Sequence, residues 1–213
     1  MSWGMNGHHE LRTDPGEGPT CLFLDGQHYL GRMDADRLVA PLGLRCAWLH
    51  SGDPADRHRD LTMSEDFLRF LEEEVVPRLR TIDVIVGLSL GGLAAAHASF
   101  RRPDLFPRAV CQSPSAWFDD ERLVRELRDA GGADAPAWIS VGRGEVEHGV
   151  SHPPTGLFQS TSQLDACGRL AEAWGPTARF APFDGGHDFA CWSAELVEAL
   201  SWVLRDSWGA EGR

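Results

Sequence analysis

Short apolar runs alternate with longer amphipathic segments along this chain, and that alternation limits the fold more than any other feature. The apolar runs lie at residues 21–24, 46–49, 82–86, 108–112, 138–141 and 179–183. Runs of this length between turn residues predict buried strands. The intervening periodicity predicts helices at 64–79, 90–100, 120–128, 164–174 and 193–206. Strands that alternate with helices predict an α/β fold, with a mostly parallel sheet flanked by helices.

The start of the predicted 64–79 helix has a recognisable signal. Thr62 is followed three residues later by Glu65, which is the spacing of a capping box. Pro77 is expected to kink the last turn, because proline removes a backbone donor and crowds the preceding turn.

The length and the charge of the chain exclude several classes of protein. With 213 residues it amounts to about one domain. We expect a short extension at 1–19, a single α/β domain at 20–208 and a tail at 209–213. The formal net charge of −12 repels phosphate backbones, so we expect no nucleic-acid partner. No run approaches 18 uncharged apolar residues, so we expect no membrane span.

The five cysteines are scattered, and none forms a CxxC pair. Cys21, Cys46 and Cys111 lie inside apolar runs, where small buried side chains are typical. The first thirty residues lack the basic and then apolar pattern of a secretory signal. We therefore expect a reduced, cytoplasmic protein.

The predicted strand at 82–86 leads directly into the segment GLSLGG at 87–92 and then into a helix. This is a G-x-S-x-G motif on a strand-to-helix turn, which would present Ser89 as a nucleophile. The N–H of Leu90, at the start of the helix, would face a developing oxyanion. A glycine-rich helix start packed under the sheet is the alternative. A phosphate-binding loop is excluded, because neither GKS/GKT nor GxGxxG is present.

A serine nucleophile needs a base, and His187 is the histidine that follows the last predicted strand. Chain order in this type of site is serine, acid, histidine. The acid should follow the strand at 138–141, where Glu145 is our first choice and Glu147 the second. A surface acid in a polar loop is the competing interpretation. Asp184 and Asp188 are too near His187 in sequence to orient it, and we interpret them as turn residues.

The second oxyanion donor is expected after the first predicted strand. There the N–H of Gln27, or that of Gly26, is the candidate, with Gly26 allowing the backbone to approach the site. The pocket itself is expected from loops at 28–42, 51–62, 117–134 and 146–157, with a flexible flap at 151–154. No ligand cluster for a metal is visible, and we expect no cofactor.

With these residues assigned, the sequence resembles the enterochelin (enterobactin) esterase family of α/β-hydrolases. The resemblance is carried by LFLDGQ at 22–27, RHRDL at 57–61, the segment 87–118, VGRGE at 141–145 and GGHDFACW at 185–192. It implies an α/β-hydrolase fold, Ser89 as nucleophile, His187 as base and an acid matching Glu145. It also implies that Arg57, Trp117 and Trp192 shape the substrate site, although both tryptophans could instead be core aromatics.

Two features depart from this family. Relatives carry an additional N-terminal domain and two further sheet strands, whereas about nineteen residues precede Thr20 here. We therefore expect a sheet of six strands with an exposed edge at 46–49, which a second copy could cover in a homodimer. Ferric catecholates are anions, which a chain of net charge −12 repels. Arg57, Arg59 and Arg143 could form a local positive patch.

The sequence thus predicts a serine esterase that acts on a small-molecule ester through an acyl-enzyme, with siderophore esters as one class of substrate. Two other functions stay open. An acyltransferase or thioesterase-like enzyme would use the same triad with another acceptor, and a hydrolase fold could serve as a binding module without catalysis.

Overall fold

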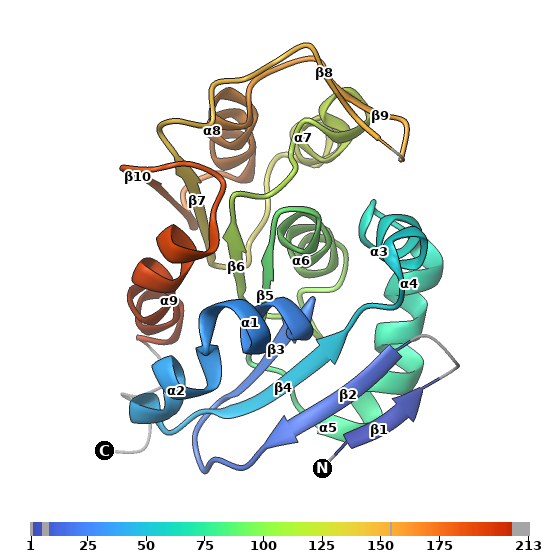
Figure 1. Cartoon of the computed structure of the whole chain (residues 1–213), viewed down its shortest axis with the longest axis vertical. Coiled ribbons are helices and arrows are strands. Elements are labelled where there is room, and N and C mark those ends of the chain that lie inside the picture. The colour runs from blue at the N-terminus through green and yellow to red at the C-terminus, as the bar shows by residue number, and fades with distance from the viewer. Residues whose placement is uncertain (1, 6–8, 154, 206–213) are drawn as a thin grey trace.

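Eight strands form the main sheet of the computed structural model, which describes residues 2–5, 9–153 and 155–205 (Figure 1). Their order is β1-β2-β4-β3-β5-β6-β7-β10, and the six strands from β4 to β10 run parallel. The strands are β1 (Ser2–Met5), β2 (His9–Asp14), β3 (Thr20–Leu24), β4 (Arg45–His50), β5 (Val84–Leu88), β6 (Ala109–Gln112), β7 (Ala137–Gly142) and β10 (Ala178–Phe183). The six predicted strands are all present, which confirms the α/β fold class. The predicted tail at 209–213 lies outside the described residues.

The sheet has two strands more than the sequence predicts, and both come from the range expected to be an extension. Strand β1 pairs antiparallel with β2, and β2 pairs antiparallel with β4 from Glu10 opposite His50 to Asp14 opposite Cys46. The predicted exposed edge at 46–49 is therefore wrong, because β2 covers it. The sequence does not predict β2, because Leu11 is the one buried residue of this strand and the strand therefore contains no apolar run.

Helices cover both faces of the sheet (Figure 1). One face carries α1 (Gly26–Met33), α2 (Ala35–Val39) and α9 (Phe189–Leu204). The other carries α3 (Pro54–Leu61), α4 (Glu65–Phe70), α5 (Val76–Leu79), α6 (Leu90–Arg101), α7 (Phe118–Ala130) and α8 (Gln163–Trp174). Alternate residues of each buried strand face opposite sides of the sheet. In β3, Cys21 and Phe23 pack on the side of α1, α2 and α9, and Leu22 and Leu24 pack on the side of α6.

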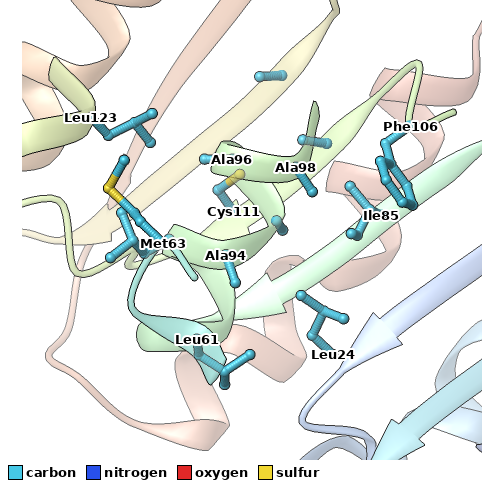
Figure 2. Packing of buried hydrophobic residues seen from close by; sticks show 14 of the residues in the cluster. Leu24, Leu61, Met63, Ile85, Ala94, Ala96, Ala98, Phe106, Cys111 and Leu123 are labelled. Atoms are coloured by element: carbon cyan, nitrogen blue, oxygen red, sulfur yellow. The ribbon is translucent and has the colours of Figure 1, made fainter. Parts of the chain in front are cut away.

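Small residues let α6 lie close to the centre of the sheet. Figure 2 shows part of this layer, in which Ala94, Ala96 and Ala98 of α6 share a buried cluster with Ile85 and Cys111 of the sheet. Helix α6 contacts both β5 and β6. Helix α6 begins immediately after Ser89, the candidate nucleophile. Its packing therefore fixes the position of the turn at Ser89 relative to the sheet.

The predicted helix at 64–79 is present and ends at Leu79 as predicted, but it differs in its cap and in its middle. The residue that caps its start is Ser64, whose Oγ accepts the N–H of Phe67 at 3.2 Å. The predicted capping box is wrong, because the Thr62 hydroxyl donates to the His58 carbonyl at 2.8 Å instead. A π-helical turn at Leu71–Val75 separates α4 from α5. Such a wider turn accommodates Pro77, which has no N–H to donate into the preceding turn.

Two of the loops expected around the pocket are largely helical. The range 28–42 holds most of α1, all of α2 and a 3-10 turn at Ala40–Leu42, while 51–62 contains α3. Helix α3 begins with Pro54, after an Asp53 carboxylate that accepts the N–H groups of Ala55 and Asp56. In the described ranges, no helix is long and apolar enough to cross a membrane.

Candidate active site

Ser89 lies on the sharp turn between β5 and α6 that the sequence predicts. Its backbone has φ 55° and ψ −120°, a conformation that costs a non-glycine residue about 1–3 kcal/mol. The surrounding structure holds it there, because the Ser89 N–H donates to Gln112 O at 2.8 Å and its carbonyl accepts Ser115 N–H at 3.0 Å. A Cβ on Gly87 would lie 2.0 Å from the carbonyl oxygen of Gly91, so the turn requires glycine at 87.

His187 reaches Ser89 from the loop between β10 and α9. Its Nε2 lies 3.1 Å from Ser89 Oγ, and its Nδ1 lies 2.6 Å from Glu145 Oε2. Because an ionised carboxylate can only accept, Nδ1 carries the proton and Nε2 is free to accept the serine proton. Glu147 lies at the cavity wall, but the acid that contacts His187 is Glu145. The three predicted residues thus meet above the carboxyl ends of the strands.

Two loops approach closely to make this contact. The N–H of Gly144 donates to the carbonyl of Gly185 at 2.8 Å, and a Cβ on Gly142 would lie 2.6 Å from the same oxygen. Asp188 caps α9 by accepting the N–H groups of Ala190 and Cys191 at 3.0 Å. The absence of side chains at 142 and 144 therefore brings Glu145 within reach of His187.

Glu145 is buried, and both of its carboxylate oxygens are hydrogen-bonded. Oε1 accepts Ser113 Oγ–H at 2.6 Å and the N–H of Gly142 at 2.7 Å, while Oε2 faces His187. Ser113 was not singled out from the sequence. The available signal was its position directly after β6, because β6 lies beside β5 and both strands end at the same edge of the sheet.

Of the predicted oxyanion donors, Leu90 lies at the cavity, whereas Gly26 and Gln27 do not line it. Leu90 begins α6 and lines the cavity, as expected. Gly26 and Gln27 begin α1 and are not among the residues that line the cavity. The close approach at Gly26 is to Trp48, since a Cβ on Gly26 would lie 2.8 Å from Trp48 Cβ. The Gln27 side-chain oxygen accepts Ser51 N–H at 3.1 Å. Packing of α1 against β4 thus accounts for Gly26.

A cavity of about 500 Å³ opens over Ser89, a volume within the usual range for small-molecule sites. Its wall includes Trp117, whose ring stacks on His152 with 5.1 Å between centroids and 13° between planes. The cavity is lined by Arg57, Ser89, Leu90, Ser115, Trp117, Gly144, Glu145, Glu147, His152, Pro153, Thr155, Leu157, Gln159, Gln163 and His187. Of the four predicted pocket loops, 28–42 contributes no residue to this wall.

The segment expected to be a flexible flap belongs to a hairpin. Strands β8 (Val150–His152) and β9 (Leu157–Gln159) pair antiparallel, with Val150 opposite Gln159. His152 Nε2 lies 3.1 Å from Gln159 Oε1, which joins the two strands through their side chains. Pro154 of the predicted flap lies outside the described residues. The hairpin forms one wall of the cavity, and His152 is a wall residue that the sequence did not single out.

The three arginines of the predicted positive patch are each bound to a carboxylate. Arg57 lines the cavity, and its Nη2 and Nε lie 2.7 and 2.8 Å from Asp25 Oδ2. Arg59 pairs with Asp56 and Asp60, and Arg143 pairs with Asp184. These partners offset the positive charge, so the structure does not bear out the expected patch.

The two predicted substrate-site tryptophans have different environments. Trp117 lines the cavity, and its Nε1–H donates to Gln163. Trp192 is only 2% exposed and is not a wall residue. Its Nε1–H donates to Ser113 Oγ at 3.0 Å, and its ring lies edge-on to His187. Trp192 therefore contacts His187 and Ser113 from outside the cavity.

The cysteines that the sequence predicts to be buried are buried. Cys21, Cys46 and Cys111 are all free thiols inside the core, as is Cys167. Burial raises the pKa of the Cys46 thiol to about 12, so this group stays neutral at physiological pH. Among the described residues, no group of three His, Cys, Asp or Glu side chains is arranged to hold a metal ion.

Comparison with known proteins finds esterases among both the related sequences and the solved structures. Iron(III) enterobactin esterase of Dickeya dadantii (strain 3937) is 24% identical over 219 residues, covering 91% of this chain and 49% of that protein. The chain therefore spans about half the length of this curated relative.

Solved structures match the fold over most of the chain. The enterobactin esterase from Shigella flexneri superimposes with a TM-score of 0.77 at 20% identity, covering 93% of this chain and 56% of that chain. The siderophore hydrolase EstB from Aspergillus nidulans gives a TM-score of 0.63 at 18% identity and covers 93% and 89%. These likenesses confirm the α/β-hydrolase fold. The family model described as "Putative esterase" matches residues 13–203, and the chain therefore belongs to this esterase family.

Proposed function

We propose that this protein is a serine ester hydrolase whose substrate is a siderophore ester or a related lactone. The observation that carries the proposal is the hydrogen-bonded series Ser89, His187 and Glu145 at the wall of the cavity, with 3.1 and 2.6 Å between neighbours. Membership of the esterase family supports the reaction type. The name of the Dickeya relative supports the substrate class.

The geometry supports a two-step reaction. His187 Nε2 takes the proton of Ser89 as Oγ attacks the ester carbonyl, and the imidazolium that forms is stabilised by Glu145. The Leu90 N–H, at the N-terminus of a twelve-residue helix, stabilises the negative charge on the carbonyl oxygen. His187 then returns the proton to the leaving alkoxide. Water repeats these steps on the acyl-enzyme and releases the acid.

The substrate proposal is tested by product analysis with purified wild-type protein. The substrates are iron-free enterobactin, a simple acyl ester and an acyl thioester. The iron-free form is chosen because the ferric complex is an anion and this chain has a net charge of −12. We expect chromatography to show conversion of the trilactone to linear acids at a kcat/KM at least about tenfold above that of the other two.

Added amines and alcohols make the same assay diagnostic for the acceptor. Free acid as the dominant product supports hydrolysis, whereas transfer of the acyl group to the added acceptor would identify an acyltransferase. If the protein cleaves simple esters but leaves the trilactone intact, the substrate class is wrong while the reaction type stands. No cleavage of any ester by the folded protein would contradict the proposed function.

The choice of acid gives a separate prediction. Replacing Glu145 with glutamine is expected to lower kcat by about 10³- to 10⁴-fold, because a neutral amide neither fixes the His187 tautomer nor stabilises the imidazolium. Glu147→Gln is the matched control, since Glu147 lies at the cavity wall without contacting His187. Steady-state kinetics should show kcat of the control within about threefold of wild type. The reverse pattern would reassign the acid to Glu147.

A further inference from the structure

A series of two hydrogen bonds ends at Glu145 Oε1, the carboxylate oxygen that does not contact His187. The indole Nε1 of Trp192 lies 3.0 Å from Ser113 Oγ, and Ser113 Oγ lies 2.6 Å from Glu145 Oε1. Ser113 is fully buried, and Trp192 is 2% exposed. Neither residue lines the cavity, so neither is placed to touch a substrate.

The chemistry of these three groups fixes the direction of both hydrogen bonds. An indole N–H can only donate, and an ionised carboxylate can only accept. The Ser113 hydroxyl must therefore accept from Trp192 and donate its own proton to Glu145. The order of donation is Trp192 to Ser113 to Glu145, with no alternative orientation of the hydroxyl that satisfies both neighbours.

The backbone of Ser113 is held in a conformation that residues other than glycine seldom adopt. Its φ is 42°, in the left-handed region. Its N–H donates to Ser140 O at 2.9 Å, and its carbonyl accepts the amide of Gln163 at 2.5 Å. Strain of this kind persists only where surrounding contacts fix it. Here it directs the Ser113 side chain toward Glu145.

Trp192 is fixed just as firmly. Its carbonyl accepts Gln112 Nε2 at 2.9 Å, and the same amide donates to the buried carboxylate of Glu195 at 2.9 Å. Glu195 also accepts Trp138 Nε1–H at 3.3 Å. Since Gln112 and Trp138 lie on β6 and β7, these bonds attach the first turns of α9 to the sheet. The Trp192 ring meets His187 edge-on, with 4.8 Å between centroids and 87° between planes.

We propose that Ser113 and Trp192 are positioning residues, which set the orientation and the charge stabilisation of Glu145 and through it the basicity of His187. This inference rests on the proposed function, because it assigns roles in the same reaction. Glu145 accepts three hydrogen bonds at its two oxygens: one from His187, one from the backbone of Gly142 and one from the Ser113 hydroxyl.

Loss of the Ser113 hydroxyl has a defined consequence for titration. The Glu145 carboxylate would lose one of its three donors, and its negative charge would be less stabilised. It would then attract the proton on the His187 imidazolium more strongly, so that His187 becomes a stronger base. Because His187 must be neutral to act as a base, the acidic limb of kcat/KM would move to higher pH.

Other titratable and charged groups surround Glu145 and His187, and the variants leave all of them in place. Burial raises the pKa of the Cys167 thiol, which keeps that group neutral. Hydrogen bonds from the backbone and from the Cys191 thiol lower the pKa of Asp188, which keeps it charged. Other such groups near the pair are Arg57, Glu147, His152, Arg143, Asp184 and Cys191.

The test compares Ser113→Ala and Trp192→Phe with wild type. Both variants should lower kcat by about tenfold with KM within twofold. Ser113→Ala removes a hydrogen bond to the Glu145 carboxylate, and Trp192→Phe removes the donor that orients the Ser113 hydroxyl; both groups lie outside the cavity. Both should shift the acidic limb of kcat/KM upward by about half to one pH unit, with the larger shift in Ser113→Ala. Trp192→Phe keeps an aromatic ring in the buried space and removes the indole N–H. It therefore tests the hydrogen-bond series even where Ser113→Ala folds poorly.

An NMR titration of the His187 ring in the resting protein provides a readout that needs no turnover. It should show the same upward shift in both variants. The matched control is Trp48→Phe, which removes a buried indole donor from a different carboxylate, Asp14, with no residue shared with this series. This control should lower the melting temperature while leaving the His187 titration and the pH profile at their wild-type positions.

The outcomes separate this inference from the proposed function. If wild-type protein hydrolyses esters but neither variant moves the His187 titration, Ser113 and Trp192 have only a structural role and the inference is wrong. An equal shift in Trp48→Phe would likewise overturn it. If the wild-type protein hydrolyses no ester, the proposed function fails, while the NMR titration still decides whether the two residues set the basicity of His187.

Discussion

Replacing Ser89 with alanine is expected to lower kcat by about a millionfold, to a residual rate that cavity binding and the Leu90 N–H still support. The variant loses the atom that would form the acyl-enzyme, while the alanine side chain, smaller than that of serine, fits the same turn. Steady-state kinetics on the best ester from the substrate panel, with mass spectrometry to exclude contaminating wild type, measures the effect.

The neighbouring histidine supplies the control for this prediction. His187→Ala should cost a similar factor, and the double variant should be hardly worse than either single one, because a nucleophile and its base act as a unit. Effects that multiply instead would show that Ser89 and His187 contribute independently. A Ser89→Ala protein that retains more than about a hundredth of the activity would contradict the role of Ser89.

The Gly87→Ala substitution should unfold or severely destabilise the protein, with a loss of more than about 4 kcal/mol. The new Cβ would lie 2.0 Å from the carbonyl oxygen of Gly91 and 2.2 Å from its carbonyl carbon. Both are backbone atoms in the first turn of α6, so relief requires moving the helix away from β5. Chemical denaturation, followed by circular dichroism, measures the loss.

Gly31→Ala is the matched control, because it adds the same methyl group to a helix with nothing within 4 Å. Gly31 lies exposed in α1, so alanine should stabilise the protein by up to about 1 kcal/mol. A Gly87→Ala protein with wild-type stability would mean that the turn at Ser89 is not as tight as the structure shows.

The parts of the fold that could be predicted from the sequence are those with an unambiguous apolar pattern. Strands such as β3 and β5 are buried at every residue, and they appear as continuous apolar runs. Strand β2 has one buried residue, and the hairpin β8–β9 is short and partly exposed, so neither produces a pattern. Helix α3 carries an Asp-Pro start signal at 53–54 but no apolar stripe, so its sequence pattern favours a loop.

The candidate site also contains residues that the sequence predicts and residues that it does not. Ser89, His187 and Glu145 were found because each follows a predicted strand at the same edge of the sheet, and the structure brings them together. The sequence signal for Ser113 is only its position directly after a predicted strand, and His152 has none, because the contacts of both residues depend on how separate loops pack. Trp192 was singled out for the cavity but is buried behind His187, since side-chain direction within α9 is set by packing.

The role of Ser89 as nucleophile is tested most directly by mapping the adduct of a fluorophosphonate probe with peptide mass spectrometry. Such probes react with serine hydroxyls that a neighbouring base activates. We expect one adduct, on the peptide that contains Ser89, with no adduct in Ser89→Ala and much slower labelling in His187→Ala. A protein that hydrolyses esters yet carries the adduct on another residue, or none at all, would contradict the assignment of Ser89.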